Sequence, residues 1–373
     1  MALTYQHAGV DITLGDEASR ILYDAARQTW ANRSGRLGEV ITPFDDFSGI
    51  RTINVGGLPP GTIMGIGFDG VGTKVEIAER TGRHDTLAFD LLAMVCDDAV
   101  VRGGEPVLAG SVLDVNSLGS SGEDHLDCIR QLAEGYIAAA KEAGVAIING
   151  ELAELGSRVG GYGRFNYSWS AGVIWFARKE RMFSGFEINP GDTLVGLREE
   201  GFRSNGLSLV RRILSDRFGT EWHTRSDGET SYGELALKPS RIYSRAVIAM
   251  FGGVEGEPAA RVHGVAHITG GGLPGKLGRI LKPKNLGASI DQPLTPGQFV
   301  LFCQEAGEVS DAEAYRTWNM GQGMVIITPE PEAVIAIARS HALDAAVIGT
   351  VTAKPGITIT SAGAFQKGTS LAF

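Results

Sequence analysis

The residues best suited to chemistry form the stretch Phe68-Asp69-Gly70-Val71-Gly72-Thr73-Lys74. It follows an apolar, glycine-containing run, Thr62 to Gly67, which predicts a strand that ends where the acid begins. A carboxylate, two glycines, a threonine and a lysine can hold a metal ion and phosphate oxygens together, because glycine admits an anion to the backbone and lysine supplies a point charge. The stretch is not a nucleotide P-loop, in which Ser or Thr follows the lysine. Taken alone, it also fits an ordinary turn.

Acids stand at the ends of two further expected strands. The run from Pro106 to Val115 predicts a strand that ends at Asp114, and the run from Val145 to Ile148 predicts a strand that leads into Glu151. Strand ends are where α/β domains place their ligands. Oxygen ligands suit Mg²⁺ brought by a nucleotide better than they suit zinc. We therefore expect these acids to take part in a nucleotide and metal site.

A third group of acids lies on the helix expected from Thr86 to about Arg102. Asp90 and Asp97 are seven residues apart and nearly eclipsed on this helix, with Asp98 a little to the side. Carboxylates among apolar neighbours are costly to bury without a cation. The pattern favours a metal ion as that cation, and a solvated acidic face is the alternative.

Two motifs in the second half of the chain could bind anions. Ser204-Asn205-Gly206 precedes an expected helix, where it can contact an anion or a ribose or act as a plain cap. Gly270-Gly271-Gly272 offers a nest of backbone N–H groups for oxyanions. His267, just before it, has the chemistry of an acid, a base or a phosphate donor, with a structural role as the alternative.

Composition narrows the class of protein. The chain has 373 residues, enough for two domains, with the join expected within residues 178–190. A net charge of -9 without a basic run disfavours nucleic acid and anionic membranes as partners. Three widely spaced cysteines fit a reducing compartment. Neither a signal segment nor an apolar run of about 18 residues is present, so we expect a cytoplasmic enzyme without a membrane segment.

Several other segments have a clear periodicity. Helices are expected over residues 17–30, 121–143 and 207–215, and another is expected to start at Lys238-Pro239. The stretch from Asn32 to Pro60 is long and irregular. Such a stretch either closes over a ligand or is a surface excursion.

Taken in order, the motifs resemble those of the aminoimidazole ribonucleotide synthetase family, the phosphoribosylformylglycinamidine cyclo-ligases. The matching motifs are Tyr5 with Ala8-Gly9-Val10-Asp11-Ile12, Asp69 to Lys74, Arg83-His84-Asp85-Thr86, Ser204-Asn205-Gly206, His267 to Gly272 and Arg316-Thr317-Trp318-Asn319-Met320-Gly321. The opening motif favours this family over others that share its fold. Those others are formylglycinamidine ribonucleotide synthetase, selenophosphate synthetase, thiamine-monophosphate kinase and a hydrogenase maturation protein.

The resemblance implies a PurM-like two-domain α/β (α+β) fold. Residues 1–182 would form an ATP- and Mg²⁺-binding domain whose mixed sheet pairs across a homodimer. Residues 183–373 would form an α/β sandwich that binds the substrate and its phosphate. The implied enzyme is a ligase of de novo purine biosynthesis, which closes formylglycinamidine ribonucleotide to 5-aminoimidazole ribonucleotide and releases ADP and phosphate.

The same resemblance implies roles for single residues. Those expected at the nucleotide are Asp69, Gly70, Gly72, Thr73, Lys74, Asp98, Asp114 and Glu151, with Asp69, Asp98 and Glu151 as metal ligands. Those expected on the substrate side are Ser204, Asn205, Gly270, Gly271, Gly272 and Arg316. His267, Lys74 and Asp69 are the expected catalytic residues.

The chain departs from the family pattern in three places. The family's GGFGG segment is replaced by residues 35–38 and 45–49, its GGETAEMPG motif is altered over 149–156, and its Asn-Asp pair is Asp97-Asp98. These departures affect the nucleotide lid and one wall of the substrate site. The alternatives are a paralogue that activates another amide, a small-molecule kinase, or a catalytically silent nucleotide-binding subunit.

Overall fold

We analysed a computed structural model of the chain, which describes residues 11–42, 51–120, 123–226 and 228–373. The predictions for the motif at residues 5–10 and for the segment 45–49 lie outside these residues. The chain divides into two compact units. Unit 1 comprises Met1–Leu58, Met64–Cys96 and Pro106–Trp175, and unit 2 comprises Pro59–Ile63, Asp97–Glu105 and Phe176–Phe373. Among the described helices, none combines the length and the apolar character that a membrane span requires.

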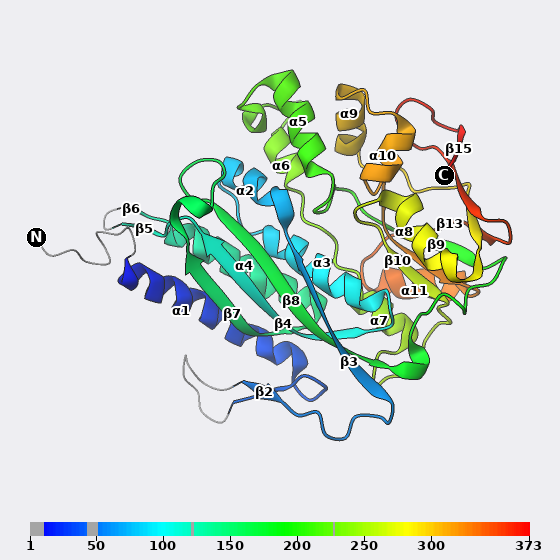
Figure 1. Cartoon of the computed structure of the whole chain (residues 1–373), viewed down its shortest axis with the longest axis horizontal. Coiled ribbons are helices and arrows are strands. Elements are labelled where there is room, and N and C mark those ends of the chain that lie inside the picture. The colour runs from blue at the N-terminus through cyan, green and yellow to red at the C-terminus, as the bar shows by residue number, and fades with distance from the viewer. Residues whose placement is uncertain (1–10, 43–50, 121–122, 227) are drawn as a thin grey trace, which may run out of the picture. The chain divides into compact units, whose positions relative to one another are not determined.

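Unit 1 is built on a four-stranded sheet in the order β3-β8-β4-β7. Its strands are β3 Thr62–Gly70, β4 Glu105–Val115, β7 Ala146–Glu154 and β8 Tyr167–Arg178, and β4 and β7 are parallel. The helices of this part of the chain are α1 Ile12–Thr29, α2 Val75–Thr81, α3 Leu87–Val100 and α4 Leu126–Ala143. In Figure 1 α1, in dark blue, runs beside α4 and β7, against which it packs. Two short hairpins complete the unit, β1 Val40–Ile41 with β2 Thr52–Ile53, and β5 Gly119–Ser120 with β6 Glu123–Asp124.

One face of β3 is apolar and open to solvent. Met64, Ile66 and Phe68 alternate along the strand and are 64%, 59% and 77% exposed. Since alternate residues of a strand point to the same side, the three side chains form one continuous apolar strip.

Unit 2 is built on a seven-stranded mixed sheet in the order β10-β12-β9-β13-β11-β14-β15. Its strands are β9 Thr193–Arg198, β10 Gly264–His267, β11 Gly287–Ile290, β12 Gln322–Thr328, β13 Ala345–Thr352, β14 Gly356–Thr360 and β15 Ser370–Ala372. β11 and β14 are parallel, and β10, β12, β9 and β13 pair antiparallel in that order. The helices are α5 Leu207–Phe218, α6 Tyr232–Ala236, α7 Ser244–Phe251, α8 Gly272–Leu281, α9 Gln298–Ala306, α10 Asp311–Thr317 and α11 Pro331–Ser340. The mixed α/β fold class expected from the sequence is confirmed.

Three expected helices begin elsewhere than predicted. α1 starts at Ile12 because Asp11 caps it, its Oδ1 accepting hydrogen bonds from the N–H groups of Thr13 and Leu14. α4 starts at Leu126 because strand β6, Glu123–Asp124, which pairs with β5, lies before it.

The helix expected at Lys238-Pro239 is wrong, since α7 starts only at Ser244. Side chains of other segments hold the backbone before it: Glu199 accepts from Arg241 N–H, and Asp97 accepts from Tyr243 N–H. Backbone bonded in this way cannot join the hydrogen-bond ladder of a helix.

Candidate functional site

The predicted acids of unit 1 occupy three strands of its sheet. Asp69 is exposed at the end of β3, where its Oδ1 accepts a hydrogen bond from Gly70 N–H at 2.7 Å. Glu151 is exposed on β7 opposite Val112 of β4, and Asp114 lies two residues further along β4. β8 separates β3 from β4. Asp114 and Glu151 are therefore on neighbouring strands, and Asp69 is on a more distant one.

The three expected metal ligands are divided between the two units, so their shared role stays a prediction. Asp69 and Glu151 belong to unit 1, whereas Asp98 belongs to unit 2. Within the described residues, no three His, Cys, Asp or Glu side chains are close enough to hold a metal ion together.

The glycine-rich turn after β3 has the geometry of a tight backbone site. Gly72 has a φ of +67° and starts a short 3₁₀ turn, Gly72–Lys74, that leads into α2. A Cβ on Gly70 would lie 3.1 Å from both the Trp169 carbonyl oxygen and Ser170 Oγ, so a larger residue would crowd β8. Gly72 and Thr73 are exposed, which leaves the turn accessible.

Lys74 has a partner that the sequence reasoning did not identify. Its Nζ lies 2.8 Å from Asp90 Oδ1, and both side chains are fully buried. A contact between Lys74 and a phosphate would require the buried ammonium to become accessible. Its phosphate-binding role stays a prediction.

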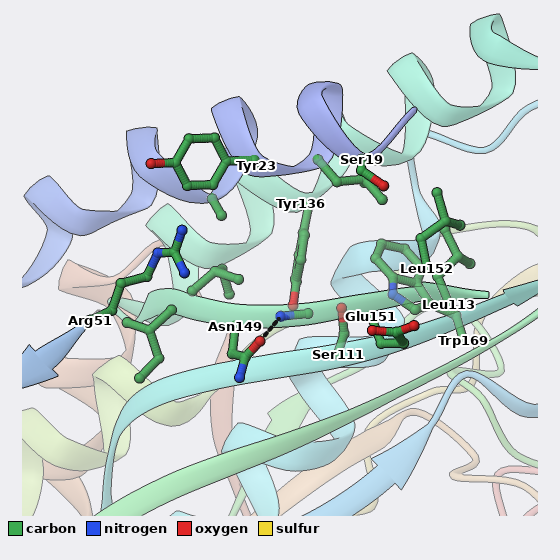
Figure 2. Close-up of a pocket in the computed structure, with 15 residues that line it drawn as sticks. Ser19, Tyr23, Arg51, Ser111, Leu113, Tyr136, Asn149, Glu151, Leu152 and Trp169 are labelled. Carbon is green, nitrogen blue, oxygen red and sulfur yellow. Dashed lines mark hydrogen bonds between the residues drawn. The ribbon is translucent and has the colours of Figure 1, made fainter. Parts of the chain in front are cut away.

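Unit 1 also contains a cavity of about 360 Å³, within the size range of small-molecule pockets. Figure 2 shows Tyr136 of α4 pointing toward the sheet, close to Asn149 and Ser111, with Glu151 also on the cavity wall. Helix α1 covers the cavity from the other side with Ser19 and Tyr23. One of the predicted acids, Glu151, thus lies on the wall of this cavity.

The predicted substrate-side residues of unit 2 converge. A Cβ on Gly270 would lie 3.6 Å from Asn205 Oδ1, and the indole N–H of Trp318 donates to the carbonyl oxygen of Gly206 at 3.3 Å. The Ser-Asn-Gly turn, the glycine nest and the chain after Arg316 therefore meet, although they are far apart in the sequence. The exposed Arg316 guanidinium lies 5.1 Å from the centre of the Phe373 ring.

The glycine nest depends on glycine at its last two positions. Gly271 and Gly272 have φ angles of +94° and +59°, a region that favours glycine. A Cβ on Gly272 would lie 1.9 Å from the Tyr315 carbonyl oxygen, so even alanine would displace the end of α10. Beside the nest, the buried Ser204 Oγ has no hydrogen-bond partner within the described part of the chain.

His267 is buried at the end of β10 and contacts two charged residues. Its Nδ1 lies 2.7 Å from Asp98 Oδ1, and its Nε2 lies 2.8 Å from Arg203 Nη2. Burial lowers the pKa of His267 to about 4; the Arg203 charge acts in the same direction, and Asp98 opposes it. The imidazole is therefore neutral at pH 7.

Arg203 and Asp97 form a buried ion pair that sequence reasoning missed. Arg203 Nη2 lies 3.0 Å from Asp97 Oδ2, and Arg203 Nη1 lies 2.9 Å from Glu199 Oε2. Burial raises the pKa of Asp97 to about 7, while Arg203 and the Tyr243 N–H hold it down. The cation predicted beside Asp97 is thus an arginine. The sequence did contain one signal for the role of Arg203, which is its position directly before the Ser-Asn-Gly motif.

A second cavity, of about 210 Å³, lies against His267 and Asp98 in unit 2. Three cationic residues, Arg102, Lys276 and Arg279, share its wall with Asp98. Asp98 is 53% exposed, and the neighbouring His267 and Lys276 keep its pKa below the ordinary value against the effect of burial. This mixture of charges suits an anionic ligand that either carries a hydroxyl group or has a metal ion beside it.

Comparison with solved structures defines the class of fold. Thiamine-monophosphate kinase from Stenotrophomonas maltophilia has a TM-score of 0.62 at 16% identity, covering 94% of this chain and 97% of the kinase. A hydrogenase maturation protein, HypE, in complex with ATP has a TM-score of 0.56 at 15% identity, covering 92% and 91%. The fold is thus that of the PurM-like two-domain proteins.

Sequence comparison then defines the family. Residues 53–173 match the N-terminal domain of AIR synthase related proteins, and residues 189–361 match their C-terminal domain. The phosphoribosylformylglycinamidine cyclo-ligase of Sorangium cellulosum is 36% identical over 90% of this chain and 91% of its own length. That of Pyrococcus furiosus is 34% identical over 97% and 98%. The chain belongs to the AIR synthase family.

Proposed function

We propose that this chain closes formylglycinamidine ribonucleotide to 5-aminoimidazole ribonucleotide with ATP, in the cytoplasmic synthesis of purines. The observation that supports this most strongly is identity of 36% to a cyclo-ligase over 90% of the chain. Free cysteines, two of them buried, fit a reducing compartment.

The reaction balances without a protein nucleophile. The formyl amide oxygen of the substrate attacks the γ-phosphorus of ATP, and ADP leaves. The amidine nitrogen then attacks the activated carbon, and the carbon–oxygen bond breaks to release phosphate with the former amide oxygen. The protein's task is to position the reactants and stabilise charge.

We place the nucleotide in unit 1, at the glycine-rich turn and the exposed acids. A nucleotide-bound Mg²⁺ ion is commonly held by one or two carboxylates together with phosphate oxygens. Asp69 and Glu151 are exposed carboxylates and fit that requirement without a group of three acids. When bound, Mg²⁺ would neutralise phosphate charge. The open Gly70–Thr73 turn would supply backbone N–H groups to the phosphates.

We place the ribonucleotide in unit 2, at the nest and the cavity beside Asp98. Ser204 Oγ, buried without a partner within the described residues, is available to bond a ligand. Gly270 and Gly271 are exposed residues, and their backbone, with Arg316 nearby, suits a phosphate. Apart from Asp98, the residues given these roles lie in residues 183–373, the expected substrate domain.

We also propose that the apolar strip on β3 is a homodimer surface. Burying a large apolar side chain is worth about 1.5–3 kcal/mol, so leaving Met64, Ile66 and Phe68 in water is costly. An open cavity of about 540 Å³ continues the strip across the same sheet. Pairing with a second copy of this sheet would cover both.

The test is turnover by the purified chain with Mg-ATP and formylglycinamidine ribonucleotide. ADP and the aminoimidazole product should appear in equal amounts. Release of neither would overturn the proposal. Phosphorylation of thiamine monophosphate instead would identify a kinase of the same fold, and ATP binding without any turnover would identify a silent nucleotide-binding subunit.

A further inference from the structure

Arg203 is held in place by contacts at both terminal nitrogens of its guanidinium. Its side chain is fully buried, and Nη1 donates to both Glu199 Oε2 and the Arg241 carbonyl oxygen at 2.9 and 2.8 Å. Nη2 donates to Asp97 Oδ2 at 3.0 Å, and the guanidinium lies 5.1 Å from the centre of the Tyr243 ring. Nε has no hydrogen-bond partner within the described residues, and the second hydrogen of Nη2 is left to point in one further direction.

That direction is the His267 ring, which fixes where the imidazole proton is. Arginine has donors and no acceptor. Because Arg203 Nη2 lies 2.8 Å from His267 Nε2, that ring nitrogen must be the acceptor. The proton of the neutral ring is then on Nδ1, which lies 2.7 Å from Asp98 Oδ1 and donates to it.

Both ring nitrogens of His267 are therefore occupied by protein groups. The ring is also only 3% exposed, although it borders the cavity beside Asp98. We propose that His267 is a positioning residue, locked by Arg203 into the tautomer with hydrogen on Nδ1, and that Asp98 is the group it presents to the substrate or its metal. His267 is then not the acid or base of the reaction.

This assignment deepens the proposed function and rests on it for the role of Asp98. The Nδ1–H bond uses one carboxylate oxygen of Asp98, a side chain that lines the same cavity as Lys276 and Arg279. A reacting group is held most accurately when neighbours fix its orientation. The Arg203 charge also lowers the pKa of Asp98, and the hydrogen bonds of His267 link the two side chains.

The tautomer is measured directly on the whole protein, without substrate, by nitrogen-15 NMR of ring-labelled histidine. The His267 signals are assigned by their loss in His267→Asn. We expect Nε2 in the unprotonated range and Nδ1 in the protonated range. Arg203→Met should give a mixture of tautomers, and Arg203→Lys, which keeps a donor, should restore the original pattern. A protonated Nε2 in the unaltered protein would overturn the proposal.

Two replacements of His267 separate positioning from acid–base catalysis. The amide nitrogen of asparagine lies near the position of Nδ1 and can still donate to Asp98, whereas that of glutamine lies near Nε2. We expect kcat within about tenfold of the original for His267→Asn and lower by about 100-fold for His267→Gln, with little change in KM. Equal losses of about 100-fold or more in both variants would indicate an acid–base role and contradict the proposal.

His263 provides a matched control. Its Nδ1 lies 2.7 Å from Asp192 Oδ2, directly before the same strand, but its ring lines neither cavity wall described above. His263→Asn and His263→Gln should leave kcat unchanged. If the chain proves inactive on formylglycinamidine ribonucleotide, the proposed function fails, and the NMR result still decides the tautomer.

Discussion

Asp69 is the residue on which the nucleotide site in unit 1 depends most. Asp69→Asn keeps the size of the side chain and removes its charge, so we expect kcat to fall by about 100-fold or more with the fold unchanged. Steady-state kinetics and circular dichroism measure the two effects. Asp127→Asn, which alters an equally small acid that is 90% exposed on α4, is the control and should be neutral. Full activity in Asp69→Asn would remove Asp69 from the site.

Lys74 has either a structural or a phosphate-binding role, and a pair of variants separates them. Lys74→Met leaves Asp90 buried without its cation, and we expect it to lower the free energy of unfolding by about 3–5 kcal/mol. Adding Asp90→Leu removes the unpaired charge and should restore most of the stability, as urea unfolding would measure.

The structure predicts that the double variant also retains turnover, because the ammonium is buried away from solvent. A double variant that is stable but has lost ATP turnover would instead assign Lys74 to the phosphates.

His84 should make unit 1 sensitive to acid. Its ring is buried, its Nδ1 lies 2.8 Å from the Tyr167 hydroxyl, and burial lowers its pKa to about 4. Since the unfolded chain binds the proton near pH 6.5, stability falls as the pH drops from 6.5 toward 4 and then levels off. At pH 5 the loss due to His84 is about 2 kcal/mol. Urea unfolding at pH 7.5 and pH 5 should show that loss in the original protein and a correspondingly smaller one in His84→Gln.

At the scale of single elements, helix α3 shows what the sequence could and could not predict. Its extent was predicted within about two residues, because its apolar spacing is regular. The need for cations beside Asp90 and Asp97 was also inferred correctly from the cost of burying carboxylates. Their identity was wrong: the cations are Lys74 and Arg203, and Arg203 is 106 residues from Asp97 in the sequence. Local spacing contains no information on such distant partners.

Two other misses have different causes. The β5–β6 hairpin consists of strands of two residues each, too short for a periodic signal. The segment before α7 is shaped by side chains of Asp97 and Glu199, which are distant in sequence. In contrast, motifs did predict three segments on the substrate side: the turn at Asn205, the glycine nest and the chain after Arg316. The structure brings these three segments together.

Strand β3 gives a test of the proposed homodimer. Ile66→Asp places a charge in the centre of the apolar strip and should convert a dimer to a monomer in sedimentation experiments. Val55→Asp is the matched control, because Val55 is 54% exposed but lies outside the sheet. A protein that is monomeric before substitution, or a dimer that survives Ile66→Asp, would contradict the assignment of this surface.

At the scale of the whole molecule, we assign the groups that bind the nucleotide to unit 1 and the groups that bind the substrate to unit 2. A substitution that damages the site in one unit should therefore weaken binding of that unit's ligand and leave binding of the other ligand unchanged. Gly272→Ala, which would bring a Cβ within 1.9 Å of the Tyr315 carbonyl oxygen, should weaken binding of the ribonucleotide and leave binding of Mg-ATP unchanged in calorimetry. Equal loss of both ligands would indicate general unfolding instead.

The central claim is that ATP activates an amide oxygen, which then leaves as part of phosphate. It is tested most directly with formylglycinamidine ribonucleotide labelled with oxygen-18 in the formyl group, in one turnover with Mg-ATP. Mass spectrometry of the released phosphate should show one labelled oxygen for each aminoimidazole formed. Unlabelled phosphate accompanying ring closure, or ADP release with no ring closure, would contradict the account.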